Sequence, residues 1–192
     1  MGHSQAEKAQ SHERILDEAA RQIREGGLES VSVGGLMKSV NLTHGGFYGH
    51  FDSRSDLIAQ ALKRALTDSR TNSRASMDAA RPVTFTTLVK RYLSPSHRDA
   101  KGRGCAIASL ATDVGRADER ARAIMEEHIE SFVARVAATL QGDSDSDKQA
   151  LVAVSAMIGA LALSRAITDT KRSDEVLRTV RDSLIESIGN DA

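Results

Sequence analysis

Residues 33–51 hold two short helical patterns joined by a turn, and this pairing limits the possible folds more than any other feature. The first pattern has four apolar residues at helical spacing: Val33, Leu36, Met37 and Val40. Asn41 interrupts it, and asparagine tolerates turn conformations well. Thr43 is a suitable N-cap for a second helix, in which Phe47 and Phe51 would face a core. A helix, a turn and a second helix with a polar outer face predict a helix-turn-helix, whose second helix enters the DNA major groove.

Longer helices are predicted on both sides of this pair. The first spans Gln5 to Glu25 and stops at two consecutive glycines, which supply a helix C-cap. After the pair, Ser53 begins a near capping box. No glycine or proline follows until Pro82, so we expect a helix from Arg54 to about Ala80, with Pro82 as a domain boundary.

Composition favours an all-α protein, because good helix formers are abundant and β-branched alternation is rare. The 26 Lys and Arg residues balance 26 Asp and Glu residues, which argues against a non-specific nucleic-acid coat. No apolar run approaches the roughly 20 residues of a membrane span, and the N-terminus lacks a signal sequence. We therefore expect a cytoplasmic protein with no membrane partner, and the single Cys105 fits a reducing compartment.

Catalytic and metal-binding patterns find little support in the sequence. There is no P-loop and no glycine-rich strand-to-helix turn, and His44 and His50 are not at a usual zinc spacing. We expect no enzymatic activity, no cofactor and no metal.

Residues 8 to about 60 resemble the N-terminal domain of the TetR family of transcriptional regulators. The resemblance rests on the run L-T-H-G-G-F-Y-G-H-F at residues 42–51 and on S-R-S-D-L at residues 53–57. It implies a three-helix DNA-binding domain at residues 8–68, with the helix-turn-helix at about 32–51. It also implies a larger helical domain for ligand binding and dimerisation at residues 69–192.

Nine residues are predicted to face DNA: Ser32, Lys38, Thr43, His44, Gly45, Gly46, Tyr48, His50 and Arg54. His44 and Gly45 lie in the first turn of the second helix, where side chains of recognition helices meet base edges. The resemblance implies that Tyr48 and Arg54 contact phosphate and that His50 ends the helix. Ser32 is placed to cap the helix that precedes the turn.

Gly45 and Gly46 violate local helix propensity, since each costs about 1 kcal/mol relative to alanine in a helix interior. One explanation is close approach of the helix backbone to DNA. The other is steric accommodation of the neighbouring helix. With few side chains left to read bases, base specificity would rest partly on DNA shape.

The C-terminal part is predicted to hold five helices: 85–92, 104–115, 118–140, 148–168 and 173–188. Residues 94–102 are predicted to form a polar loop and residues 141–147 an acidic one. The helix at 148–168 is apolar on nearly all faces, so it must be buried on all faces. A second subunit would cover it, which predicts a homodimer through the last two helices. The resemblance implies the same dimer.

The resemblance also implies a pocket for a small-molecule effector, and nine residues are its predicted lining: Phe85, Leu88, Tyr92, Cys105, Ile107, Met125, His128, Phe132 and Met157. Each could equally be plain core. Cys105 follows Lys101 and Arg103 at an expected helix start, where cations and backbone N–H groups stabilise a thiolate. It is either a redox or electrophile sensor or a small buried side chain.

These patterns together predict a homodimeric TetR-type regulator, a repressor that an effector releases from operator DNA. One alternative is a regulator that senses oxidants or electrophiles through Cys105, or answers to a protein partner, without a reversible small ligand. Another is an all-α enzyme or carrier whose C-terminal domain does the work.

Overall fold

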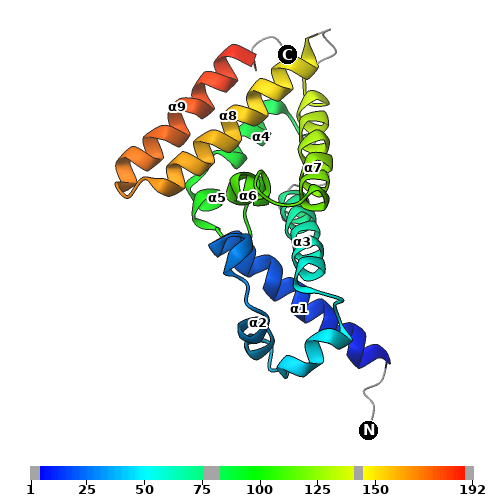
Figure 1. Cartoon of the computed structure of the whole chain (residues 1–192). Coiled ribbons are helices and arrows are strands. Elements are labelled where there is room, and N and C mark those ends of the chain that lie inside the picture. Colours follow the sequence, from blue (N-terminus) through cyan, green and yellow to red (C-terminus); the bar gives the residue numbers. More distant parts are fainter. Residues whose placement is uncertain (1–4, 76–82, 141–144, 189–192) are drawn as a thin grey trace.

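Helices form wherever the sequence places apolar residues at helical spacing, and they make up most of the described structure. The computed structural model describes residues 5–75, 83–140 and 145–188, and within these ranges it contains helices and no strand (Figure 1). The all-α fold class is confirmed. The predicted domain boundary at Pro82 and the end of the helix near Ala80 lie outside the described residues.

The N-terminal head consists of α1 (Gln5–Gly26), a 3₁₀ turn η1 (Leu28–Ser30), α2 (Val33–Ser39), the 3₁₀ helix η2 (His44–Gly49) and α3 (Arg54–Ala75). Its core gathers one apolar face from each helix; the largest fully buried side chains there are Ile15, Ile23, Leu36, Met37, Phe47, Phe51, Leu57 and Leu62. Burying a side chain of this size stabilises the fold by roughly 1.5–3 kcal/mol. These side chains form the head's part of a core that continues into the C-terminal helices.

Caps set where the head helices begin. The Ser32 hydroxyl accepts a hydrogen bond from the Gly35 N–H at 3.2 Å, and the Ser53 hydroxyl accepts one from Asp56 N–H at 3.0 Å. Both predicted serine caps are confirmed. Thr43 occupies the N-cap position of η2, but its side chain makes no cap hydrogen bond. The predicted second helix is a six-residue 3₁₀ helix, because its two central glycines have low α-helix propensity. The turn that precedes it contains Asn41, which has a φ of 57°.

The C-terminal domain contains α4 (Phe85–Tyr92), α5 (Pro95–Asp99), α6 (Ala106–Val114), α7 (Glu119–Ala137), α8 (Ser146–Ala166) and α9 (Thr170–Ile188). In Figure 1, α8 and α9 run side by side at the end of the molecule opposite α2. Between these ends, α3 packs against α6 and α7. The head and the domain that holds α8 and α9 therefore meet along α1, α3, α6 and α7.

All the helices predicted after residue 92 have ends that differ by one to three residues from the structure, since α6, α7 and α8 span Ala106–Val114, Glu119–Ala137 and Ser146–Ala166, and two differences stand out. Residues 94–102, predicted as a loop, contain the one-turn helix α5. Ser94 caps α5 by accepting from His97 N–H at 3.2 Å, and Pro95 occupies its first turn. The last helix begins at Thr170 instead of Ser173, because Asp169 accepts the N–H of Arg172 at 2.7 Å.

Helix α8 departs from expectation in a second way. The helix is long and apolar enough to cross a membrane, with a mean hydropathy of 1.5, so the statement that no apolar stretch approaches this length is wrong. The apolar runs of α8 are interrupted only by small residues such as Ser155 and Gly159, which lower its mean hydropathy only slightly. Nor is α8 buried on all faces within one chain, since Leu151, Val152 and Leu163 are each more than half exposed.

Arg24 joins the head to the C-terminal domain. Its Nε donates to the Gly102 carbonyl at 2.7 Å and its Nη1 donates to the Ala65 carbonyl at 3.0 Å. The Asp68 carboxylate lies 3.8 Å away. Because Gly102 belongs to the segment between α5 and α6, this one side chain ties α1 to α3 and to the second domain.

Candidate nucleic-acid interface

The recognition helix η2 is fixed to the head by aromatic packing. Phe47 is buried, and its ring stacks on the buried Phe51 with centroids 5.5 Å apart. The ring of Tyr48, the next residue, packs edge-on against the Phe47 ring with centroids 5.2 Å apart, yet Tyr48 remains 71% exposed. An aromatic side chain held at its base and open at its hydroxyl is well placed to donate to a phosphate.

The outer face of the helix-turn-helix is polar and exposed. Lys38 at the end of α2, Thr43 before η2 and His44 in its first turn are all exposed. Ser32, also exposed, lies at the N-terminus of α2, where unpaired backbone N–H groups favour an anion. The predicted DNA-facing residues of α2 and η2 therefore lie on two consecutive short elements.

The glycines of η2 are not required by the packing of the head. A methyl group at Gly45 would meet no heavy atom within 4 Å, and one at Gly46 would make ordinary contacts at 3.6 Å with Thr43 Oγ1 and 3.7 Å with Met37 Cε. Neither glycine has a positive φ. Steric accommodation of the neighbouring helix, one of the two explanations, therefore finds no support in the chain itself.

Arg54 makes contacts that its sequence position does not indicate. Its guanidinium donates to the carbonyls of Val31 at 3.2 Å and Leu28 at 3.4 Å, and pairs with the Glu29 carboxylate at 3.0 Å. It clamps the start of α3 to the segment that leads into α2. Phosphate contact by Arg54 stays a prediction, and the side chain already has internal partners in the free protein.

His50 ends η2 against α1. Its Nδ1 is buried without a hydrogen-bond partner, and the His12 ring of α1 lies 6.0 Å away, centroid to centroid. Burial lowers the pKa of His50 below its usual range, and the neighbouring His12 and Lys8 lower it further. The imidazole of His50 is therefore held neutral in the free protein.

The predicted effector lining divides by burial. Six of the nine residues are buried in the core: Phe85, Cys105, Ile107, Met125, Phe132 and Met157. Leu88, Tyr92 and His128 are partly exposed. None of the nine lines either of two surface hollows found among the described residues.

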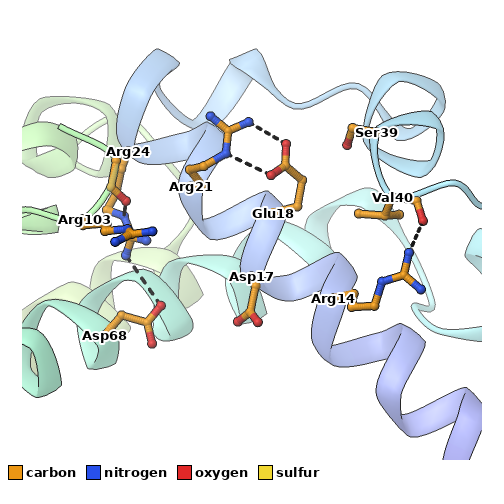
Figure 2. Close-up of a pocket in the computed structure, with 10 residues that line it drawn as sticks. Arg14, Asp17, Glu18, Arg21, Arg24, Ser39, Val40, Asp68 and Arg103 are labelled. Atoms are coloured by element: carbon orange, nitrogen blue, oxygen red, sulfur yellow. Dashed lines mark hydrogen bonds and ion pairs between the residues drawn. The ribbon is translucent and has the colours of Figure 1, made fainter. Parts of the chain in front are cut away.

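Both hollows lie beside α1. One, of about 550 Å³, is bounded by α1, the end of α2, α3 and Gly102, and is lined largely by charged side chains (Figure 2). Figure 2 shows those charges engaged with each other: Arg21 with Glu18, Arg24 with Asp68, and Arg14 with the Val40 carbonyl. The second, of about 680 Å³, opens between α1, α3 and α7.

Cys105 belongs to a buried polar cluster with Tyr92, His97 and Arg165. The Cys105 N–H donates to His97 Nε2 at 3.1 Å, while His97 Nδ1 donates to the Tyr92 carbonyl at 2.7 Å, which fixes the neutral tautomer of the ring. The Tyr92 hydroxyl is buried without a hydrogen-bond partner. Its pKa is raised well above its usual value, first by burial and then by the neighbouring Cys105 thiol. Cys105 is the N-cap residue of α6, one position before the helix in whose first turn it was predicted, and its side chain makes no cap hydrogen bond.

The geometry defines a class of protein: an all-α protein with a helix-turn-helix of the DNA-binding type near its N-terminus and further helices packed against it. Residues 15–61 match the family model of the bacterial regulatory proteins of the tetR family. The match spans α1, the helix-turn-helix and the start of α3.

Solved structures share the fold over nearly the whole chain. A TetR-family transcriptional regulator from Cytophaga hutchinsonii superposes with a TM-score of 0.79 at 22% identity, covering 98% of each chain. One from Chloroflexus aurantiacus gives 0.78 at 19% identity, covering 96% of each chain. The reduced form of Escherichia coli NemR gives 0.72 at 17% identity, covering 91% of this chain and 95% of NemR. No curated protein is significantly similar in sequence.

Residues 15–61, within the head, match the tetR family of bacterial regulatory proteins, and the whole described fold is the one seen in solved TetR-family regulators. The resemblance seen in the sequence is thereby confirmed. Sequence reasoning did not find the internal contacts of Arg54, nor the unpaired, buried nitrogen of His50. Both depend on contacts between residues more than 20 positions apart or between different helices, which leave no local signal.

Gly45→Ala tests why glycine stands in the recognition helix. Because a Cβ at this position meets nothing in the free protein, we expect unchanged stability or a gain of up to about 1 kcal/mol. If the backbone approaches DNA closely, the added methyl group should weaken operator binding by tenfold or more, from an overpacking cost of about 1–3 kcal/mol. Thermal unfolding measures the effect on stability, and fluorescence anisotropy measures the effect on operator binding.

Gly49→Ala is the control for the change in helix propensity, because a Cβ at Gly49 also meets nothing within 4 Å. Unchanged operator affinity in Gly45→Ala would remove the close-approach explanation.

Proposed function

We propose that the chain is a cytoplasmic, homodimeric repressor whose two heads bind successive major grooves of an approximately palindromic operator, and which a small-molecule effector releases. The observation that carries the DNA-binding part is the η2 surface, where an exposed Tyr48 stands beside exposed His44 and a glycine-lined backbone. The match of residues 15–61 to the tetR family supports operator DNA as the partner. The effector would act in the C-terminal domain and change the spacing of the heads.

The exposed side chains of the helix-turn-helix would contact different parts of the DNA. Lys38 and Tyr48 would contact phosphates, with support from the N-terminus of α2 at Ser32. His44, in the first turn of η2, would read a base edge. Since η2 offers few other side chains, DNA shape would supply part of the specificity.

Three substitutions test this function. Lys38→Ala should weaken binding at all sequences and reduce the salt slope by about one phosphate charge. Tyr48→Phe removes only an exposed hydroxyl, so it should weaken binding at all sequences by roughly fivefold without changing the salt slope. His44→Ala should instead change sequence preference. Binding to duplexes from the upstream DNA, measured across salt concentrations, provides the readout, and exposed Lys171 on α9 gives a control, Lys171→Ala. Unaltered binding in all three head variants would exclude this interface.

Dimerisation is supported by the unpartnered apolar face of α8. Leu151, Val152 and Leu163 are exposed, and Gly159 on the same helix has open space where a Cβ would stand. A glycine with open space beside it allows another helix to approach closely. The polar residues Ser155 and Arg165 on α8, and its contacts with α7 and α9, favour a second copy over a membrane as the covering partner.

Leu163→Glu places a charge on the exposed apolar face of α8 that forms the proposed interface. We expect the wild type to have the mass of a dimer by light scattering and this variant to have the mass of a monomer, because an unpaired carboxylate is costly to bury. Arg122→Glu, exposed on α7, should leave the dimer intact. A monomeric wild type, or one that partitions onto lipid vesicles through α8, would contradict the proposal.

A second candidate for control is Cys105, favoured by the cluster around it. The thiol shares a buried site with the Tyr92 hydroxyl and the Arg165 guanidinium. Oxidation or alkylation there would disturb α6 at its N-cap. Cys105→Ser should abolish any loss of DNA binding caused by hydrogen peroxide or N-ethylmaleimide, while reversible effectors remain active. An equal loss in both proteins would exclude Cys105 as the sensor.

A further inference from the structure

Three nitrogen-bearing side chains meet where α1 crosses the end of the recognition helix. Lys8 and His12 lie one turn apart on α1, and His50 follows the last residue of η2. The His12 ring stacks on Phe51 at 4.7 Å and lies 6.0 Å from the His50 ring. We call Lys8, His12 and His50 the α1–η2 basic cluster.

The neighbouring charged groups that shift His50 are of one kind. They are His12 and Lys8, both from α1. Glu13, next to His12, pairs with Arg64 on α3, and Asp52, two residues after His50, is exposed. The described contacts therefore place no carboxylate against His50 to balance a proton.

His50 is also short of a hydrogen-bond partner. Its Nδ1 is buried and unpaired, which costs free energy in a folded protein. A protonated His50 would place a cation on this partly buried ring beside Lys8 and His12, which is unfavourable without an anion. The missing component is a negative charge supplied from outside the chain.

We propose that the α1–η2 basic cluster binds a backbone phosphate of duplex DNA and takes up a proton on the His12–His50 pair as it does so. This inference rests on the proposed function, because it assigns a further contact and a pH dependence to the same DNA interface. The phosphate lies beside those contacted by Tyr48, since Tyr48 and His50 are two residues apart at the end of η2.

The sign of the pH dependence follows from linkage. In the free head, burial, His12 and Lys8 lower the pKa of His50 from 6.5, so the ring is neutral near pH 7. A bound phosphate stabilises the protonated ring and raises its pKa, so the complex holds more protons than the free components. Affinity therefore increases as pH falls toward the pKa of the free ring. With one proton taken up, the increase approaches tenfold per pH unit.

Operator affinity measured by anisotropy at about pH 6 and about pH 8, at constant salt, tests the proposal. The wild type should bind more tightly at the lower pH. His50→Gln and His12→Gln, which cannot take up a proton, should lose most of that difference. Tyr48→Phe is the matched control, because it should weaken binding equally at both pH values and keep the wild-type difference.

Nuclear magnetic resonance provides an independent readout. The imidazole of His50 should titrate below its usual range in the free protein and at a higher pH in the complex. The same spectra show whether each variant is folded. If a variant loses DNA binding because it is unfolded, the titration of His50 in the wild type, with and without DNA, decides whether the proposal holds.

Two results would overturn the proposal. One is wild-type affinity that does not change with pH, together with a His50 titration that DNA leaves unmoved. The other is a pH dependence that survives intact in both glutamine variants. In either case salt-dependent duplex binding would still support the proposed function, whereas absence of duplex binding at any pH would overturn both.

Discussion

The buried guanidinium of Arg24 is the interaction on which the arrangement of head and C-terminal domain depends. Among the described residues it is the one charged side chain that is buried. Burial lowers its pKa, which the charge of Asp68 opposes, so the cation needs its acceptors to stay in place. Those acceptors are the carbonyls of Ala65 and Gly102. A buried cation with fixed acceptors tolerates little sliding, and α1 is thereby held in one register against both α3 and the α5–α6 segment.

The same segment is held from its other side by a second arginine. Arg165 of α8 donates to the carbonyls of His97 and Arg98 at 3.2 and 3.1 Å, and to the Ser109 hydroxyl at 2.9 Å. Gly104 lies between, where a Cβ would come within 2.6 Å of the Arg165 guanidinium and 2.8 Å of the Ala100 carbonyl. Residues 97–104 are therefore hydrogen-bonded both to Arg24 of α1 and to Arg165 of α8. A change at α8 or at Cys105 has a short, hydrogen-bonded route to the head, which is the kind of contact that coupling between sites requires.

Much of this fold could be predicted from the sequence because its signals are local. Apolar spacing located α1, α2 and α4, and the serine caps at Ser32 and Ser53 are visible as residue types in fixed positions. The 3₁₀ form of η2 was not predictable from apolar spacing, since it follows from weak propensity under tertiary packing. The backbone carbonyls that accept hydrogen bonds from Arg54 and Arg24 include groups 23 and 78 positions away in the sequence. Contacts over such distances leave no periodic pattern in the sequence. The candidate site was thus predictable as a set of exposed residues on the helix-turn-helix, but its electrostatics were not.

That electrostatic pattern explains how a chain with no net charge can present a DNA-binding face. Every arginine in residues 5–68 has a hydrogen-bond or ion-pair partner within the chain. Arg14 donates to the Val40 carbonyl, Arg21 and Arg64 pair with acids of α1, and Arg24 and Arg54 hold backbone carbonyls. Arginine suits this work because its planar fork of donors satisfies several acceptors at once. Lysine and histidine side chains, with backbone N–H groups, are left to meet phosphate in the proposed complex. Few full charges then contribute to binding, so the salt dependence should be shallow, and the protonation state of a histidine carries more weight than it would beside a row of arginines.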